Sequence, residues 1–172
     1  MNFVTFSNLF VFQLDFHMHN NIESWASSDS ILKYGFRFSD INFFRCISTT
    51  LKKLGRSLIP SALLKHIKKS NNIVIYHIVT IDIITNLNFL YYKKQRKPTD
   101  ILTFPYQDDY TNVLGEIFIN PESANNKSVQ KLENITIYCK RLIVHGLLHL
   151  LLGKHSSFFD TIEESILQEL NN

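Results

Sequence analysis

The feature that most constrains the fold is the segment from Ser128 to Leu152. It has the residue spacing of a helix and is apolar on nearly all sides in its second half. A helix with that pattern lies buried in the centre of a fold rather than on its surface. The segment carries His145 and His149, so it takes two imidazoles into the interior, where an unpaired ring nitrogen costs free energy. A bound metal ion would satisfy both rings.

The spacing of the histidines favours the same interpretation. Two histidines four residues apart project from one face of a helix, because four residues complete slightly more than one turn. His155 follows six residues after His149 and cannot share that face of a straight helix, but Gly153 gives the chain a place to turn back. Three neutral imidazoles with one open position are the ligand set of a catalytic zinc site. We therefore predict that His145, His149 and His155 bind one metal ion, with zinc as the expected metal.

The composition indicates a globular chain. Its 172 residues suit one compact domain, and 45% hydrophobic with 19% charged residues exclude extensive disorder. We expect a single domain over residues 1–172, with residues 1–10 as a loose N-terminal extension. The net charge of +3 is compatible with a nucleic-acid partner but does not establish one. Cys46 and Cys139 lie in apolar, helix-like stretches and are expected to be buried thiols rather than a disulfide.

The N-terminal stretch is apolar, which raises the question of a signal peptide or a membrane anchor. It lacks a basic region and a small-residue cleavage site, and Ser7, Asn8 and Gln13 interrupt it. Elsewhere no uninterrupted apolar run reaches the roughly 18 residues that cross a bilayer. A cytoplasmic protein without a membrane partner is the expectation.

Periodicity and turn residues predict the order of elements along the chain. A capping box at Thr161 and Glu164 is expected to open the last helix. The predicted strands are 11–19, 73–84, 101–104 and 114–120, the predicted helices are 41–54, 60–69, 85–92 and 128–152, and 121–127 is predicted as a loop.

Two further sets of residues are candidates for function. Glu116 is acidic within an otherwise apolar strand, so it either points outward or serves a site. The basic run 93–97 contains Lys93, Lys94 and Arg96 and directly follows two tyrosines. Basic and aromatic side chains together hold phosphates and stack on bases in single-stranded RNA binding, while the simpler alternative is a solvated loop.

Several segments together resemble the YbeY family of bacterial endoribonucleases, which are also described as ribosomal-RNA maturation factors. The segments occur in the family's order with similar intervals, and four motifs in order are more specific than any one of them. The resemblance covers roughly residues 71–170 and is weaker before them. The matching segments are Leu87-Asn88, Lys97 to Pro105, Leu114 to Ile117, and His145 to His149 with His155.

The resemblance implies an α+β fold in which a small mixed β-sheet packs against helices and a central buried helix carries metal ligands. It also implies a metal-dependent, single-strand-specific endoribonuclease that acts on small-subunit ribosomal RNA and in ribosome quality control. Single-stranded RNA, ribosomal RNA and the ribosome are then the expected partners, and DNA is not.

The chain departs from the family pattern at three places. The glycine after the second histidine comes one position late, and Lys154 replaces the acidic neighbour of the third histidine. The family's arginine after Leu-Asn has no direct counterpart, which leaves Tyr92, Lys93 or Arg96 as stand-ins. The acidic residue after Leu-Gly is more often Asp than Glu.

The predicted mechanism places a water-bearing ion on the three histidines, with His145 and Glu116 as catalytic candidates and Lys93, Lys94 or Arg96 on the RNA backbone. Two alternatives stay open. One is a ribosome-associated assembly factor whose metal is mainly structural. The other is a zincin-like metallopeptidase, which the histidine spacing also fits, but such enzymes carry a glutamate base directly after the first histidine, where this chain has Gly146.

Overall fold

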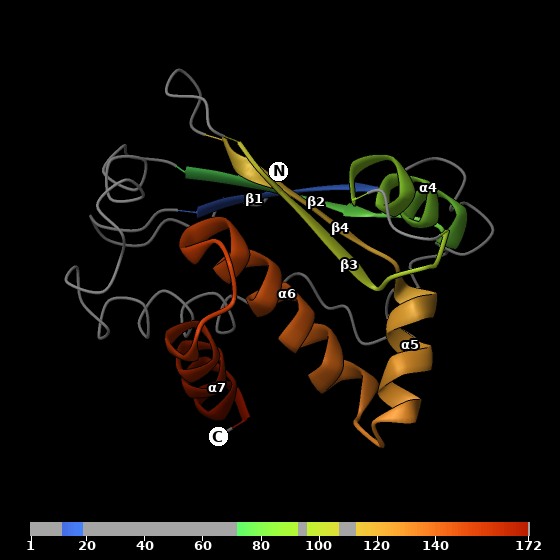
Figure 1. Cartoon of the computed structure of the whole chain (residues 1–172). Helices are drawn as coiled ribbons and strands as arrows, with labels where there is room; N and C mark the ends of the chain where they lie inside the picture. The colour runs from blue at the N-terminus through green and yellow to red at the C-terminus, as the bar shows by residue number, and fades with distance from the viewer. Residues whose placement is uncertain (1–11, 19–71, 93–95, 107–112, 172) are drawn as a thin grey trace.

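The computed structural model describes residues 12–18, 72–92, 96–106 and 113–171 (Figure 1). Within these ranges, four strands form one sheet and four helices pack around it. The predicted helices 41–54 and 60–69 lie outside the described residues, and so do Cys46, Lys93 and Lys94.

The described sheet has the strand order β1-β2-β4-β3. Its strands are β1 (Phe12–Met18), β2 (Asn72–Ile78), β3 (Ile101–Pro105) and β4 (Val113–Ile119). The pairs β1–β2 and β2–β4 are parallel and β3–β4 is antiparallel, so the sheet is mixed. β3 therefore forms one edge of the sheet in the described part of the chain.

Helices cover both faces of this sheet. α4 (Ile81–Tyr92) lies on one side, and α5 (Pro121–Gln130), α6 (Ile135–Leu152) and α7 (Ser157–Asn171) lie on the other (Figure 1). Successive side chains of β4 point to opposite faces of the sheet. Ile117 packs in the cluster that contains α6, and Phe118 packs in the cluster that contains residues of α4. The predicted α+β fold, a small mixed sheet packed against helices with a central buried helix, is confirmed.

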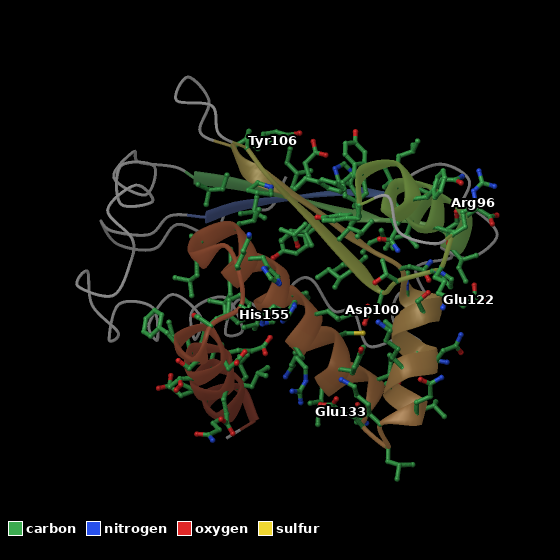
Figure 2. All side chains as sticks on the ribbon, viewed as in Figure 1. Arg96, Asp100, Tyr106, Glu122, Glu133 and His155 are labelled. Carbon is green, nitrogen blue, oxygen red and sulfur yellow. The ribbon has the colours of Figure 1, made fainter. Side chains whose placement is uncertain are left out.

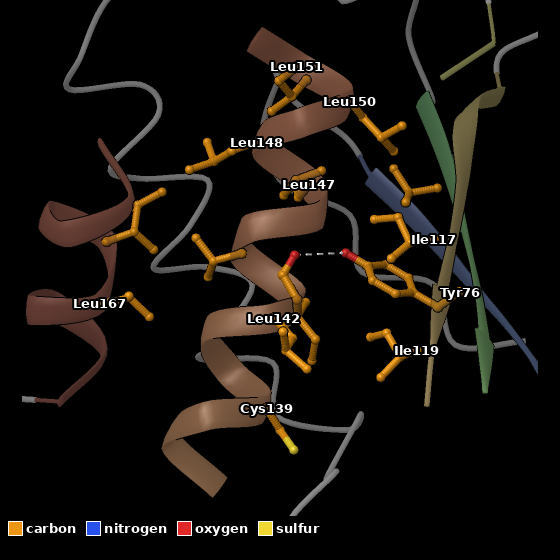
Figure 3. Packing of buried hydrophobic residues seen from close by; sticks show 14 of the residues in the cluster. Tyr76, Ile117, Ile119, Cys139, Leu142, Leu147, Leu148, Leu150, Leu151 and Leu167 are labelled. Carbon is orange, nitrogen blue, oxygen red and sulfur yellow. Dashed lines mark hydrogen bonds between the residues drawn. The ribbon is translucent and has the colours of Figure 1, made fainter. Parts of the chain in front are cut away.

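The buried central helix is α6, and it forms the larger core with β2, β4 and α7 (Figure 3). The Tyr76 hydroxyl donates a hydrogen bond to the Ile143 carbonyl over 3.4 Å, which satisfies this polar group within the core. Cys139 is a buried free thiol, as predicted. By length and composition α6 could cross a membrane, but 56% of it is buried within the fold, as in the core helix of a soluble domain.

Two glycines let α6 lie close to the sheet. A Cβ at Gly146 would meet Ile101 and Ile117 side chains at 3.0 Å, and one at Gly115 would lie 2.4 Å from the Phe104 carbonyl oxygen and 2.6 Å from Leu150. Position 146 therefore faces the sheet. Close packing against the sheet is thus a second reason for glycine at this position, where metallopeptidases carry their glutamate base.

The predicted strand 73–84 is too long. β2 ends at Ile78, and Ile81 already belongs to α4. The Val79 N–H donates to the Ile119 carbonyl, and the Thr80 carbonyl then accepts from Ile84 in the first turn of the helix. β-branched residues favour strands only weakly, so the composition of this stretch did not reveal where the strand ended.

Two predictions after β4 are also wrong, and both errors come from unrecognised helix caps. The predicted loop 121–127 is part of α5, because the Asn120 side chain accepts from the Ser123 N–H at 2.7 Å and Pro121 suits the first helical position. The predicted helix 128–152 is divided in two, since Asn134 caps a new helix by accepting from the Thr136 N–H.

The predicted capping box at Thr161 is wrong as well. α7 begins at Ser157, and the Ser156 hydroxyl oxygen accepts from the Phe159 N–H at 3.1 Å. Thr161 instead lies inside the helix, where its hydroxyl donates to the Ser157 carbonyl at 2.8 Å. A threonine in that position gives no start signal, because the cap lies five residues earlier.

Candidate metal centre

The three predicted ligands meet at the end of α6. His145 and His149 are one turn apart, and their ring centroids are 4.7 Å from each other. α6 continues through Leu152 and ends at Gly153, whose φ of 79° is a left-handed conformation that glycine adopts without strain. The turn brings the His155 ring to 5.0 Å from His145 and 4.8 Å from His149, and one nitrogen of each ring lies within 4.8 Å of the others.

Each histidine also has an oxygen beside its Nδ1 atom. The partner is a Glu163 carboxylate oxygen at 2.8 Å for His145, the Gly153 carbonyl at 2.7 Å for His149, and an Asp160 carboxylate oxygen at 3.4 Å for His155. An oxygen acceptor at Nδ1 holds the proton on that nitrogen, which leaves the lone pair on Nε2. This is the usual arrangement around histidines that bind metals.

The distance between the inner nitrogens fits a metal ion. The Nε2 atoms of His145 and His149 are 3.1 Å apart. Two nitrogens that bind one tetrahedral zinc ion at about 2.05 Å lie roughly 3.4 Å from each other. If both Nδ1 atoms hold protons, two lone pairs face each other here, and a cation between them would turn that repulsion into attraction. The three residues present therefore fit the ion that the sequence predicts.

The protonation state of His149 also favours metal binding. Burial lowers the pKa of His149, and the neighbouring His145 and His155 lower it further, although its bond to the Gly153 carbonyl opposes this shift. His149 is therefore neutral at pH 7, the form in which an imidazole can bind a metal ion.

α7 forms the floor of the site, and the sequence analysis missed its contribution. The Phe159 ring is fully buried, and its centroid lies 5.4 Å from that of His145, 4.9 Å from that of His149 and 4.5 Å from that of His155. Glu163 follows four residues later, one helical turn along the same face. An aromatic residue and a carboxylate at this spacing, soon after the third histidine, are the signal that could have revealed them.

The histidines open into a pocket of about 760 Å³. α6 and the following turn line one side with the three histidines, Gly153 and Lys154, and β3 lines another with residues such as Ile101 and Thr103. Asn88 and Tyr92 of α4 complete the wall beyond β3. A volume of this size is typical of a site that holds one small ligand or one residue of a polymer.

The structure does not bring Glu116 to the histidines. Its strand neighbour Ile117 faces α6, so Glu116 points to the opposite face of the sheet. There its carboxylate accepts a hydrogen bond from the Tyr106 hydroxyl and lies 3.4 Å from His77 Nε2. The hydrogen bond to this carboxylate is the main reason that the pKa of Tyr106 rises to about 12. Nothing in this placement supports Glu116 as the base.

The predicted RNA-binding cations are only partly described. The Arg96 guanidinium lies 5.4 Å from the centroid of the Phe89 ring on α4 and does not line the pocket. Figure 2 shows Arg96 beside α4, well away from His155. Lys93 and Lys94 lie outside the described residues.

The acidic residue in the segment from Lys97 to Pro105 stabilises the fold. Asp100 is 4% exposed and accepts hydrogen bonds from the Lys127 ammonium at 2.5 Å and the Tyr138 hydroxyl at 2.6 Å. Burial favours the neutral acid, but these bonds and the Lys127 charge outweigh it and hold the pKa of Asp100 below its usual range. Asp100 thereby ties the start of β3 to α5 and α6.

Comparisons with known proteins identify the family of this chain. The sequence profile of a family described as "Endoribonuclease YbeY" matches residues 42–170. Proteins named Endoribonuclease YbeY from Aquifex aeolicus and Ehrlichia canis are 35% and 42% identical over 83 and 77 residues, which cover 47% and 44% of this chain and 54% and 50% of those relatives. The chain thus spans about half the length of these two relatives.

Other matches are longer. The protein of the same name from Ehrlichia ruminantium (strain Gardel) is 31% identical over 140 residues, which are 71% of this chain and 83% of the relative. A solution structure of TM1509 from Thermotoga maritima has a TM-score of 0.45 at 20% identity, and covers 77% of this chain and 83% of that chain. That structural likeness is too loose to bear on function.

Proposed function

The chain belongs to the YbeY family of endoribonucleases, and from this premise we propose that it is a metal-dependent endoribonuclease that cleaves single-stranded RNA. The observation that carries the proposal is the convergence of three imidazoles, each with an oxygen beside Nδ1, on a pocket large enough for one nucleotide. Ribosomal RNA of the small subunit, on the ribosome and in the cytoplasm, is the proposed substrate, and quality control of ribosomes is the proposed wider role.

In this proposal the chain's own residues hold and orient the metal ligands. His145, His149 and His155 would hold the ion, and the Glu163 carboxylate beside Nδ1 would keep the His145 proton on that nitrogen. When bound, a zinc-like ion supplies a Lewis acid for the scissile phosphate and lowers the pKa of a water molecule. Phe159 excludes solvent from the back of the rings, which strengthens electrostatic interactions at the site.

Substrate contacts outside the pocket are assigned to the basic run. Lys93, Lys94 and Arg96 come soon after α4 in the sequence, and the last residue of α4 lines the pocket, which supports their assignment to the backbone of an RNA strand that leaves the pocket. None of the described residues that line the pocket is a carboxylate, and Glu116 lies on the other face of the sheet.

A cleavage assay tests the proposal. Purified protein is incubated with an end-labelled single-stranded RNA, with the same strand in a duplex, and with a DNA strand of equal sequence. Each incubation is run with untreated protein, with chelated protein, and with chelated protein to which zinc or manganese is added back. We expect cuts in the single-stranded RNA that chelation abolishes and metal restores. Metal bound at one equivalent without any cleavage would favour the assembly factor with a structural metal. A parallel incubation with casein tests the peptidase, which cleavage of casein would favour.

A further inference from the structure

The pocket contains one basic side chain that no prediction assigned to the substrate. Among the described residues that line it, Lys154 is the one Lys or Arg. Lys154 stands between Gly153, which ends α6, and His155, so its backbone is fixed next to the proposed metal ligands. A bound cation would repel the positive charge of Lys154. An anion that enters the pocket would attract both charges and offset this repulsion.

The opposite wall presents an aromatic ring. Tyr92 is the last residue of α4 and lines the same pocket, and its hydroxyl donates to the Thr103 carbonyl on β3 at 3.1 Å. This bond anchors the end of the side chain, yet the residue is 45% exposed. Its ring lies 6.2 Å from that of Phe104, centroid to centroid and tilted. Proteins stack unpaired bases on aromatic side chains that are held at the surface in this way.

Resting on the proposed function, we propose that Lys154 and Tyr92 form a subsite for one nucleotide of single-stranded RNA. The Lys154 ammonium donates to a phosphodiester oxygen beside the histidines, and the Tyr92 ring stacks on the base of that nucleotide across β3. A base inside a duplex is paired and stacked on both sides, so it cannot lie on Tyr92 without leaving the helix. The subsite thereby selects single strands.

The phosphate half of the subsite is tested by binding. Fluorescence anisotropy measures the affinity of the full chain for a short labelled RNA, with a chelator present so that the strand stays intact. We expect Lys154→Ala to weaken binding about tenfold and to lower the salt dependence by about 0.7 in the log–log slope, as expected for one lost phosphate contact. Lys154→Arg should restore most of the affinity. Lys131→Ala removes the same charge at an exposed position outside the pocket and should change the affinity less than twofold.

The base half needs a probe that separates stacking from folding. Tyr92→Phe keeps the ring and Tyr92→Leu removes it, and we expect a loss of about tenfold for the leucine variant alone. A series of strands, each with one abasic nucleotide at a different position, locates the base that contacts Tyr92. The strand that lacks this base should bind the wild type and Tyr92→Phe more weakly than the intact strand. Tyr92→Leu should bind both strands equally. If Tyr92→Leu fails to fold by circular dichroism, the abasic series on the other two proteins decides.

The outcomes separate this subsite from the nuclease activity. Binding that is unchanged in Lys154→Ala and insensitive to every abasic position overturns the subsite, whether or not the RNA is cut. A wild type that binds no RNA also overturns it. Binding that depends on Lys154 and Tyr92, in a protein that never cleaves RNA once metal is restored, supports the subsite and refutes the nuclease.

Discussion

Both faces of the sheet carry a histidine beside a glutamate, and the two pairs differ in what surrounds them. On the α6 face, Glu163 lies 2.8 Å from His145 Nδ1, and two more imidazoles meet the first at the mouth of a pocket. On the α4 face, Glu116 lies 3.4 Å from His77 Nε2, while the His77 ring stacks on Phe118 with centroids 4.3 Å apart. A histidine–carboxylate pair is therefore not a site in itself. The convergence of further ligands on an accessible space distinguishes the first pair from the second.

The largest expected effect is the loss of metal from a variant on the α6 face that a matched variant on the α4 face does not show. His149→Ala should lose the bound metal and reduce RNA cleavage by at least about 100-fold, because two imidazoles rarely hold zinc against competing buffers. His77→Ala is the matched variant on the other face and should keep one equivalent of metal. Metal content by mass spectrometry of the native protein, with cleavage rates beside it, checks both. Equal metal loss in the two variants would contradict the assignment of the site to the α6 face.

This contrast also shows what the sequence could and could not predict. The three histidines are close in the chain, and helix geometry with a glycine turn was sufficient to predict that His145, His149 and His155 lie together. Glu116 also looked functional, but its distance from the histidines depends on which face of β4 points to α6, and that requires the register and packing of the whole sheet. Local pattern alone carries no such information.

The same limit explains the missed residues. Glu163 and Phe159 belong to the site because α7 folds back along α6, a tertiary contact that no short motif records. Helix boundaries failed for a different reason. Asn120, Asn134 and Ser156 each cap a helix through a hydrogen bond to a backbone N–H, and a polar residue before a helix looks the same as one in a loop.

A second variant tests Asp100, a carboxylate on the α6 side of the sheet that is not part of the proposed metal site. Asp100→Ala should lower the free energy of unfolding by about 2–3 kcal/mol at pH 7, because the buried Tyr138 hydroxyl loses its acceptor and the Lys127 ammonium its partner. Metal content should not change. Asp100→Asn keeps an acceptor without the charge and should lie between the two proteins.

The pH dependence of that loss has a definite sign. The pKa of Asp100 is lowered in the fold, so its contribution is complete above the ordinary carboxyl pKa of about 4 and disappears as the pH falls through the lowered value. Urea unfolding of wild type and Asp100→Ala should therefore converge on acidification below about pH 4. Curves that stay parallel down to pH 2 would show that the ionised form of Asp100 does not provide the stability.

Glu163 and Glu116 allow a second comparison of the two faces, with a smaller expected effect on the zinc dissociation constant. Glu163→Gln places an amide beside His145 Nδ1 and weakens the acceptor that keeps the proton there, so the zinc dissociation constant should rise about tenfold. Glu116→Gln is the same change on the other face and should leave that constant unaltered. Competition with a chromophoric chelator measures both, and the exposed neighbour Glu164→Gln controls for charge lost near the site. A constant that is unchanged in Glu163→Gln would remove Glu163 from the site.

The smallest effect is expected at the third histidine. His155 Nδ1 lies 3.4 Å from an Asp160 carboxylate oxygen, and both side chains are more than half exposed, at 55% and 67%. Water competes for such a contact and screens its charge, so it contributes little. Asp160→Asn should therefore raise the zinc dissociation constant no more than about threefold, and less at high salt, in the same chelator competition. An effect as large as that of Glu163→Gln would mean that Asp160 closes on His155 when the ion binds, and that the third ligand is held as firmly as the first.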